Sequence, residues 1–188
     1  MHRYALPFAF LLVTGCGYNT IQRYDETVNA AKNQIEVQLQ RRADLIPNLV
    51  NTVKGYAQQE QDVFVQVTQA RAGLLGAVQK GDPREMANAN DQLTSALGRL
   101  MVVVEAYPDL KSNENFLRLQ DELTGTENRI AVSRTDYNDA VRTYNTYIRT
   151  LPQSITAKVT GAKQREYFEV TDPGARTAPT VDFSKPKS

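Results

Sequence analysis

The sequence predicts an all-α protein: an antiparallel bundle of three to four long helices, the first kinked near Pro47, followed by a mobile C-terminal tail. Apolar residues recur every seven positions along most of the 188 residues, as in helices packed lengthwise against partners. No β-rich stretch precedes residue 167. We therefore divide the chain into a leader (1–15), a helical bundle (16–168) and a Pro-rich tail (169–188).

The leader has the pattern of a bacterial lipoprotein signal. Arg3 supplies a positive charge, and the apolar stretch from Tyr4 to Val13 is far shorter than the roughly 20 residues of a membrane-spanning helix. Val13-Thr14-Gly15-Cys16 resembles a lipobox, in which the cysteine is acylated and becomes the new N-terminus. We expect lipid on Cys16 to attach the protein to a membrane, since two or more acyl chains anchor stably.

The charge balance argues against nucleic acid as a partner. Cleavage would remove Arg3, which leaves the remaining basic residues equal in number to the 21 acidic ones. Binding to nucleic acid is favoured by a basic surface. A neutral chain of this length predicts instead one domain with a substantial core.

The first helical region begins near Ile21 and shows two apolar rows. The first row, seven residues apart, comprises Ile21, Val28, Ile35, Leu49, Tyr56, Val63, Ala70 and Ala77. The second comprises Leu39, Ile46, Val53, Val67 and Leu74. Arg42 interrupts the first row and Glu60 the second.

Pro47 lies inside this region and removes one backbone donor. Either one helix of about 60 residues continues through a kink at Pro47, or Asp44 to Pro47 form a turn between two antiparallel helices. The seven-residue spacing is unchanged across Pro47, and no glycine or asparagine stop signal precedes it. These features favour the continuous helix.

The later boundaries have capping signals. Gly81 ends one helix, and Asp82-Pro83-Arg84-Glu85 places a cap, a proline at the first helical position and a glutamate two residues later. The second long helix should run until Tyr107-Pro108. Its apolar positions are Met86, Ala89, Leu93, Ala96, Leu97, Leu100, Met101 and Val104.

The third long helix should begin at a Ser112 cap and be limited by Pro152. Its apolar row comprises Phe116, Leu123, Ile130, Tyr137, Tyr144 and Leu151. A short helix is expected around Thr156 to Gln164. From Thr171 the chain is rich in Pro, Thr, Ser, Lys and Gly, and we expect it to be mobile.

Several motifs closely resemble those of the LemA family. They are Gly17-Tyr18-Asn19, Gln38-Leu39-Gln40-Arg41-Arg42-Ala43-Asp44-Leu45-Ile46-Pro47-Asn48-Leu49-Val50, Val53-Lys54-Gly55-Tyr56-Ala57, Ala70-Arg71, Asn113-Glu114-Asn115-Phe116, Leu119-Gln120, Glu122-Leu123, Thr126-Glu127-Asn128-Arg129-Ile130, Tyr137-Asn138, Tyr144-Asn145 and Pro179-Thr180-Val181-Asp182-Phe183. The resemblance implies a membrane-attached bacterial helical bundle without established enzymatic activity. A relative takes part in organising magnetosome membranes, which implies scaffolding. Many relatives keep an uncleaved membrane helix, and the cysteine at this boundary departs from that pattern.

The residues themselves offer little for catalysis. Without residues 1–15 the chain has no histidine, and its only cysteine should be blocked by lipid. Ser-His-Asp and Cys-His catalysis and His/Cys metal sites are then unavailable, and no nucleotide-binding glycine loop occurs. A hydrolase using carboxylates alone, such as Asp121 and Glu122 near Glu127, is the poorer hypothesis because charged residues on long helices are usually solvated. We expect no enzyme, cofactor or metal site.

Two groups of polar and aromatic residues are candidate sites. The first, a register or interaction network, comprises Arg41, Arg42, Asp44, Pro47, Asn48, Lys54, Glu127, Asn128 and Arg129. It is either an ion-pair network that fixes helix register or a hinge and partner-docking surface. The second is the aromatic stripe of Tyr137, Tyr144 and Tyr147. It is either bundle core or a groove for a ligand between helices.

The sequence thus predicts a lipid-anchored adaptor or scaffold in the bacterial cell envelope. It would face the periplasm or the exterior and contact a protein partner, and homo-oligomers are also compatible with the apolar rows. Gly17 follows Cys16 where an aspartate would signal inner-membrane retention, so outer-membrane delivery is favoured in a cell with two membranes. The alternative is a protein that binds peptide, glycan or lipid between its helices.

Overall fold

A computed structural model describes the backbone of residues 5–169 and the side chains from Gly17 onward. Its helices are α1 (Ala5–Lys54), α2 (Gln61–Lys80), α3 (Pro83–Val104), α4 (Pro108–Lys111), α5 (Glu114–Tyr147) and α6 (Gln153–Thr160). Residues 5–169 contain no strand, which confirms the all-α class. The Cys16 side chain, where lipid is predicted, lies outside the described part of the chain. The segment from Thr171 onward, which is predicted to be mobile, also lies outside it.

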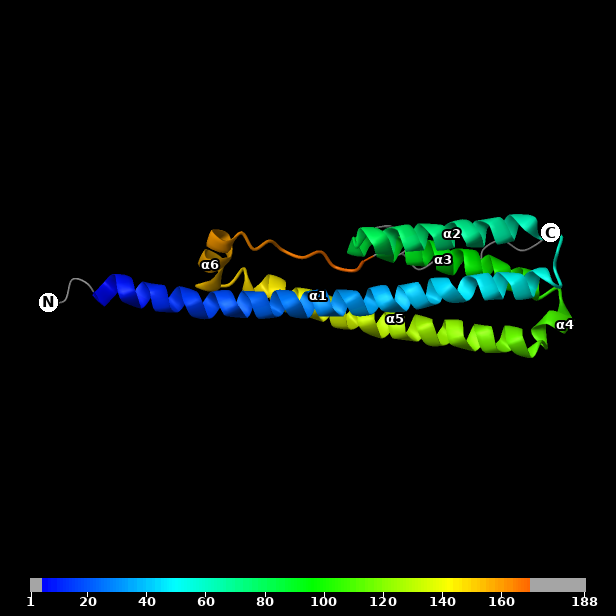
Figure 1. The fold of residues 1–188 in the computed structure, drawn as a ribbon, viewed down its shortest axis with the longest axis horizontal. Coiled ribbons are helices and arrows are strands. Elements are labelled where there is room, and N and C mark those ends of the chain that lie inside the picture. Colours follow the sequence, from blue (N-terminus) through cyan, green and yellow to red (C-terminus); the bar gives the residue numbers. More distant parts are fainter. Residues whose placement is uncertain (1–4, 170–188) are drawn as a thin grey trace, which may run out of the picture.

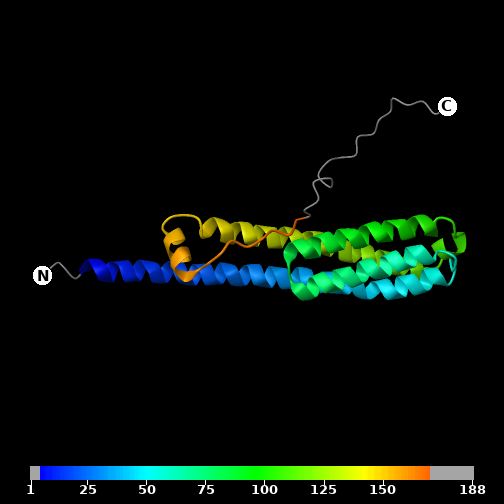
Figure 2. The same ribbon diagram turned by 90° about the horizontal axis from the view of Figure 1, so that it is seen from above.

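The helices form an elongated antiparallel bundle. The long helices α1 and α5 lie side by side, and the hairpin of α2 and α3 covers one half of their length (Figure 1, Figure 2). We call the end that carries α6 the proximal end. The distal end comprises the turn at residues 55–60 and α4.

The first helix continues through Pro47, as favoured, but it ends at Lys54 instead of reaching residue 80. The prediction of one helix of about 60 residues across this region is therefore wrong, and so is the alternative turn before Pro47. Gly55 follows the last helical residue, and Ala57 closes the turn through its amide, 2.9 Å from the Val53 carbonyl. The seven-residue spacing runs across this turn by coincidence, because Tyr56 in the first row is 41% exposed.

The predicted boundary between α2 and α3 is confirmed. Gly81 adopts φ 68°, a left-handed conformation that glycine reaches without the steric cost of a side chain. The Asp82 carboxylate accepts hydrogen bonds from the amides of Arg84 and Glu85, and Pro83 occupies the first helical position.

Some smaller predictions need correction. The cap of α5 is Asn113, whose side chain accepts from the Phe116 amide, and not Ser112. The Ser112 hydroxyl instead donates to carbonyls of α4, a helix that the sequence did not predict. The end of the α5 row is also different, because Leu151 lies beyond the helix and is 79% exposed. The short helix α6 begins before the predicted start at Thr156 and ends before the predicted end at Gln164.

The core follows the predicted rows through the middle of α1, α3 and α5. Ile35, Leu39, Leu93 and Leu100 are completely buried. In residues 5–169, no helix combines the length and the apolar composition needed to cross a membrane.

Candidate functional site

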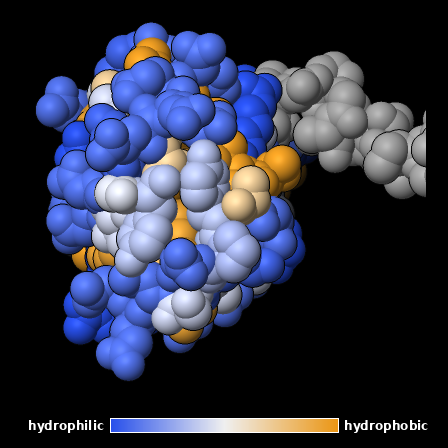
Figure 3. Space-filling model, turned by 90° about the vertical axis from the view of Figure 1, so that its right-hand side faces the viewer, coloured by the Kyte–Doolittle hydropathy of each residue, from blue (hydrophilic) through white to orange (hydrophobic). Residues whose placement is uncertain are grey.

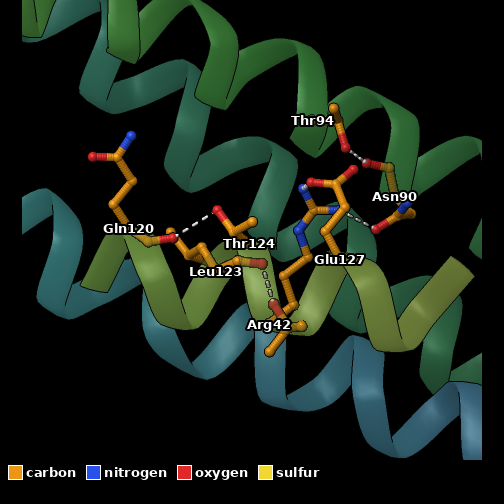
Figure 4. Close-up of polar contacts among 8 residues, drawn as sticks. Arg42, Asn90, Thr94, Gln120, Leu123, Thr124 and Glu127 are labelled. Atoms are coloured by element: carbon orange, nitrogen blue, oxygen red, sulfur yellow. Dashed lines mark hydrogen bonds and ion pairs between the residues drawn. The ribbon is translucent and has the colours of Figure 1, made fainter. Parts of the chain in front are cut away.

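The most buried polar side chain that projects from α1 in the described residues is Arg42, which is 2% exposed. It leaves α1 and reaches between α3 and α5 (Figure 4). Its Nη1 donates to Asn90 Oδ1 at 2.6 Å, and its Nη2 lies 3.0 Å from Glu127 Oε2. One guanidinium therefore joins three helices that are distant in sequence.

Burial and neighbouring charges have opposite effects on the pKa of Arg42. Burial lowers the pKa of the guanidinium, whereas the charges of Glu127 and Asp91 raise it. Arginine nevertheless stays protonated in proteins, so the core holds a cation. Burial also raises the pKa of the Asp91 carboxyl, against the opposing effect of Arg134 and Arg42.

Pro47 creates a second contact, at Ala43, the residue that follows Arg42. Because Pro47 has no N–H, the carbonyl of Ala43, four residues earlier, receives no helical hydrogen bond. Arg71 of α2 donates its Nε to this carbonyl at 2.8 Å. Ala43 is fully buried, so the bond satisfies a carbonyl that water does not reach.

Together these contacts tie one turn of α1 to three other helices. We name Arg42, Ala43, Arg71, Asn90 and Glu127 the polar junction. Of the predicted network, the structure brings together only Arg42 and Glu127. Sequence reasoning missed Asn90 as a member. Arg71 belongs to the Ala70-Arg71 motif, but its position in the sequence contains no signal that it would reach the carbonyl of Ala43.

The other members of the predicted network lie at the surface. Exposed side chains belong to Arg41, Asp44, Pro47, Asn48, Lys54, Asn128 and Arg129. Asp44 accepts from Gln40 within α1, and the Lys54 ammonium lies 5.4 Å from the centre of the Phe64 ring. Asp121 and Glu122 are exposed on α5.

The three tyrosines of the predicted aromatic groove lie in different surroundings. Tyr137 is buried and donates its hydroxyl to the Glu166 carbonyl at 2.8 Å. Tyr144 lines an open cleft of about 330 Å³ together with Asp25 and residues 160–165. Tyr147 packs edge-on against Tyr24, with 5.1 Å between ring centres, and lines a different hollow.

Two asparagines of α5 hold the extended segment that follows α6. We name residues 163–169 the strap. The Asn145 side chain accepts from the Arg165 amide at 2.8 Å and donates to the Arg165 carbonyl at 2.9 Å. Asn138 makes the same pair of bonds to Phe168, at 2.9 and 3.3 Å.

The spacing of these pairs explains why they fit together. Seven helical residues, from 138 to 145, span about 10.5 Å. Three extended residues, from 165 to 168, span about 10 Å. Two asparagines one heptad apart therefore match the backbone of the strap, as a neighbouring strand would in a sheet.

Ion pairs add contacts between the strap and other helices. Arg165 forms a bidentate pair with Asp25 of α1, with a shortest distance of 2.7 Å. Glu166 lies 3.5 Å from Arg84 at the start of α3. Burial raises the pKa of Tyr137 to about 12, so its hydroxyl remains a donor to the strap at neutral pH.

These contacts define a helical bundle whose buried polar groups serve packing between its own elements. No cluster of three or more potential metal ligands occurs within the described part of the chain. The chain belongs to the LemA family, whose family model matches residues 31–183.

Named relatives agree with this assignment. The chain is 33% identical over 186 residues to magnetosome protein MamQ 2 of Paramagnetospirillum magneticum, covering 86% of this chain and 68% of the relative. It is 30% identical over 183 residues to magnetosome protein MamQ of Magnetospirillum gryphiswaldense, covering 85% and 67%. Protein LemA of Metamycoplasma hominis is 27% identical over 149 residues, covering 75% and 67%.

Proposed function

We propose that this protein is a non-catalytic scaffold of the bacterial cell envelope, anchored by lipid on Cys16. The observation that carries the proposal is the continuity of α1, which runs from Ala5 to Lys54 without a break. Ile21, five residues after Cys16, is already 1% exposed in the bundle core. An anchor at Cys16 would thus be joined to the bundle without a flexible linker.

The length of α1 determines what such a scaffold could do. From Cys16 to Lys54 the helix extends about 57 Å at 1.5 Å per residue. The distal end would be held at that distance from the anchor. Its surface is mainly hydrophilic, with only scattered apolar side chains (Figure 3), which suits a reversible contact with a protein partner.

The relatives and the burial pattern support this proposal. Two of the relatives are named magnetosome proteins, and these names are compatible with a function at a membrane. In the polar junction and at the strap, buried polar groups bond to other parts of the chain, although Arg42 Nε has no hydrogen-bond partner among the described residues. We place the protein at the cell membrane facing the periplasm or exterior, and at the outer membrane of a cell that has two.

Photo-crosslinking in living cells tests the scaffold. A photoreactive residue replaces Val102 or Leu117 near the distal end, or Val132 on the shaft of α5 as a control of similar exposure. We expect a discrete adduct from the distal positions and none from position 132, with lipid on Cys16 confirmed by mass spectrometry. An adduct with a second copy would reveal a homo-oligomer.

Two outcomes would contradict the proposal. An unmodified Cys16 with residues 1–15 still attached would refute the lipid anchor. Equal labelling of unrelated envelope proteins from distal and shaft positions would refute a partner surface at the distal end.

The cleft beside Tyr144 favours one second candidate, a binding protein for peptide, glycan or lipid. Asp25 and Arg165, which form an ion pair, both line it, and a few polar groups among the lining residues are a feature of sites that orient a ligand. A molecule that stays bound in native mass spectrometry, and is lost when Tyr144→Ala opens the cleft, would support this function over the scaffold.

A further inference from the structure

The proximal end carries an exposed apolar row. Leu151, Ile155 and Val159 recur every four residues on and just before α6, and they are 79%, 51% and 82% exposed. The opposite face of α6, with Thr156 and Ala157, is buried. The row therefore lies on the side of α6 that faces away from the bundle.

The position of α6 relates this row to the anchor. Helix α6 lies across α1 near its N-terminal part in both ribbon views (Figure 1, Figure 2). A Cβ added to Gly17 would lie 3.3 Å from Thr156 Oγ1, so α6 packs against the residue that follows Cys16. The apolar row thus stands level with the predicted lipid.

The segment of the chain that contains the row is basic. Residues 140–165 contain five basic side chains and no acidic one. Arg142 and Arg165 pair with Asp139 and Asp25. The remaining three, Arg149, Lys158 and Lys163, are exposed and have no acidic partner within residues 17–169.

We infer that Leu151, Ile155 and Val159 insert into the interfacial layer of the bilayer that holds Cys16, so that α6 rests on the membrane. The inference depends on the proposed membrane anchor. An apolar helix face flanked by lysine and arginine is the pattern of helices that lie in the membrane surface, where basic residues contact anionic lipids. With α6 seated, the bundle would stand on two supports, the lipid and the helix.

Fluorescence quenching in vesicles tests this inference. Lipidated protein carrying Val159→Cys, labelled with a polarity-sensitive dye, is reconstituted in vesicles of equal parts phosphatidylcholine and phosphatidylglycerol. Val132→Cys on the shaft of α5, where the native side chain is 61% exposed, is the matched control. We expect the dye at position 159 to be quenched several-fold less by aqueous iodide, and more by lipid-borne nitroxide, than the dye at position 132.

A second vesicle composition measures how much the attraction between the basic residues and anionic lipid contributes to membrane contact. In vesicles of phosphatidylcholine alone, the protection at position 159 should decrease. The triple variant Leu151→Ser, Ile155→Ser and Lys158→Glu, in the same labelled protein, should raise iodide access to the level of the control. Circular dichroism confirms that the variant keeps its helices.

The outcomes separate this inference from the anchor. Protein that floats with vesicles but gives equal iodide access at positions 159 and 132 refutes the inference and leaves the anchor intact. Protein that does not float refutes both. Efficient disulfide formation between two copies through position 159 would show that the row is a self-association surface, which also overturns the inference.

Discussion

Arg42 and Glu127 form one ion pair, but they occupy very different environments. The Arg42 side chain is 2% exposed, whereas that of Glu127 is 52% exposed. If Arg42 is removed, water can solvate the glutamate. If Glu127 is removed, the buried guanidinium loses its nearest counter-charge, and water cannot replace it.

Glu127→Ala should therefore cost more stability than Arg42→Met. We expect a loss of about 2–3 kcal/mol for the first change and about 1 kcal/mol or less for the second, which keeps an apolar side chain of similar length. Urea unfolding of both variants and of the double variant measures the difference. The reverse order would mean that packing by the arginine stem, rather than charge, is the main contribution of the pair.

The contact between Pro47 and Arg71 predicts a non-additive pair. Arg71→Met should cost about 1–2 kcal/mol, since it leaves the buried Ala43 carbonyl without a donor. In a Pro47→Ala background the same change should cost less than half as much, because an alanine in place of the proline supplies the missing helical N–H. If Arg71→Met cost the same stability with proline and with alanine at position 47, Arg71 would not be compensating for the N–H that Pro47 lacks.

Tyr137 should make stability depend on pH in the alkaline range. Burial raises its pKa to about 12 from an ordinary value of 10.0. Folding favours the neutral phenol, so its contribution is complete below about pH 10 and is lost as pH rises towards 12; a two-unit shift corresponds to roughly 3 kcal/mol. Urea midpoints measured between about pH 9 and pH 11 should fall less steeply in Tyr137→Phe than in the parent.

Single residues of the sites were only partly predictable from sequence. Arg42 is noticeable in the sequence because a charge interrupts an apolar row. The predicted network contained both Arg42 and Glu127, but the sequence did not assign the ion pair between them. Asn90 and the action of Arg71 depend on which helix turns face each other. That information is not contained in the spacing along one helix.

Among the elements of the fold, the strap is the one that the sequence predicts least well. Helices α3 and α5 were predictable since their apolar rows and caps are local. The strap has no periodicity, and its partners Asn138 and Asn145 lie 20 to 30 residues earlier in the chain. The asparagines were visible as a repeat beside tyrosines, but nothing local indicated that they hold backbone.

Asn145→Ala should release the strap without unfolding the bundle. The change removes the two hydrogen bonds between the Asn145 side chain and the Arg165 backbone. We expect the backbone amide of Arg165 to exchange with deuterium at least about tenfold faster, because a loss of about 1.4 kcal/mol in local stability corresponds to a factor of ten. Amides in the middle of α3 should be unaffected. Asn128→Ala, an exposed asparagine on the same helix, is the control and should leave Arg165 protected.

The turn after α1 shows how a correct pattern led to a wrong element. The apolar spacing continued across residues 55–60, so the sequence favoured one helix where the structure has two. Gly55, directly after the last residue of α1, is the local signal in the sequence that the helix ends there. At the start of α2 the buried aromatic residue is Phe64, which belongs to neither of the predicted apolar rows.

Across the molecule as a whole, α1 continues through Pro47 as one helix, and we expect it to behave as a rigid rod. Spin labels at Tyr18 and Asn51, both exposed, should give a narrow distance distribution near 50 Å at about 1.5 Å per residue. Pulsed electron paramagnetic resonance measures this distance. A broad or bimodal distribution would indicate bending at Pro47, which the contact from Arg71 to Ala43 should prevent.

The unbroken helix between Cys16 and the distal end has a mechanical consequence for the proposed anchor. If lipid holds Cys16 in a bilayer, no flexible linker separates that point from the bundle, and a change in the slope of the bilayer would tend to rotate the whole of α1. A tilt of about ten degrees would displace a point about 57 Å away by about 10 Å, given the rise of the helix. Anchored in the proposed way, the protein would convert local membrane curvature into lateral movement of its distal end.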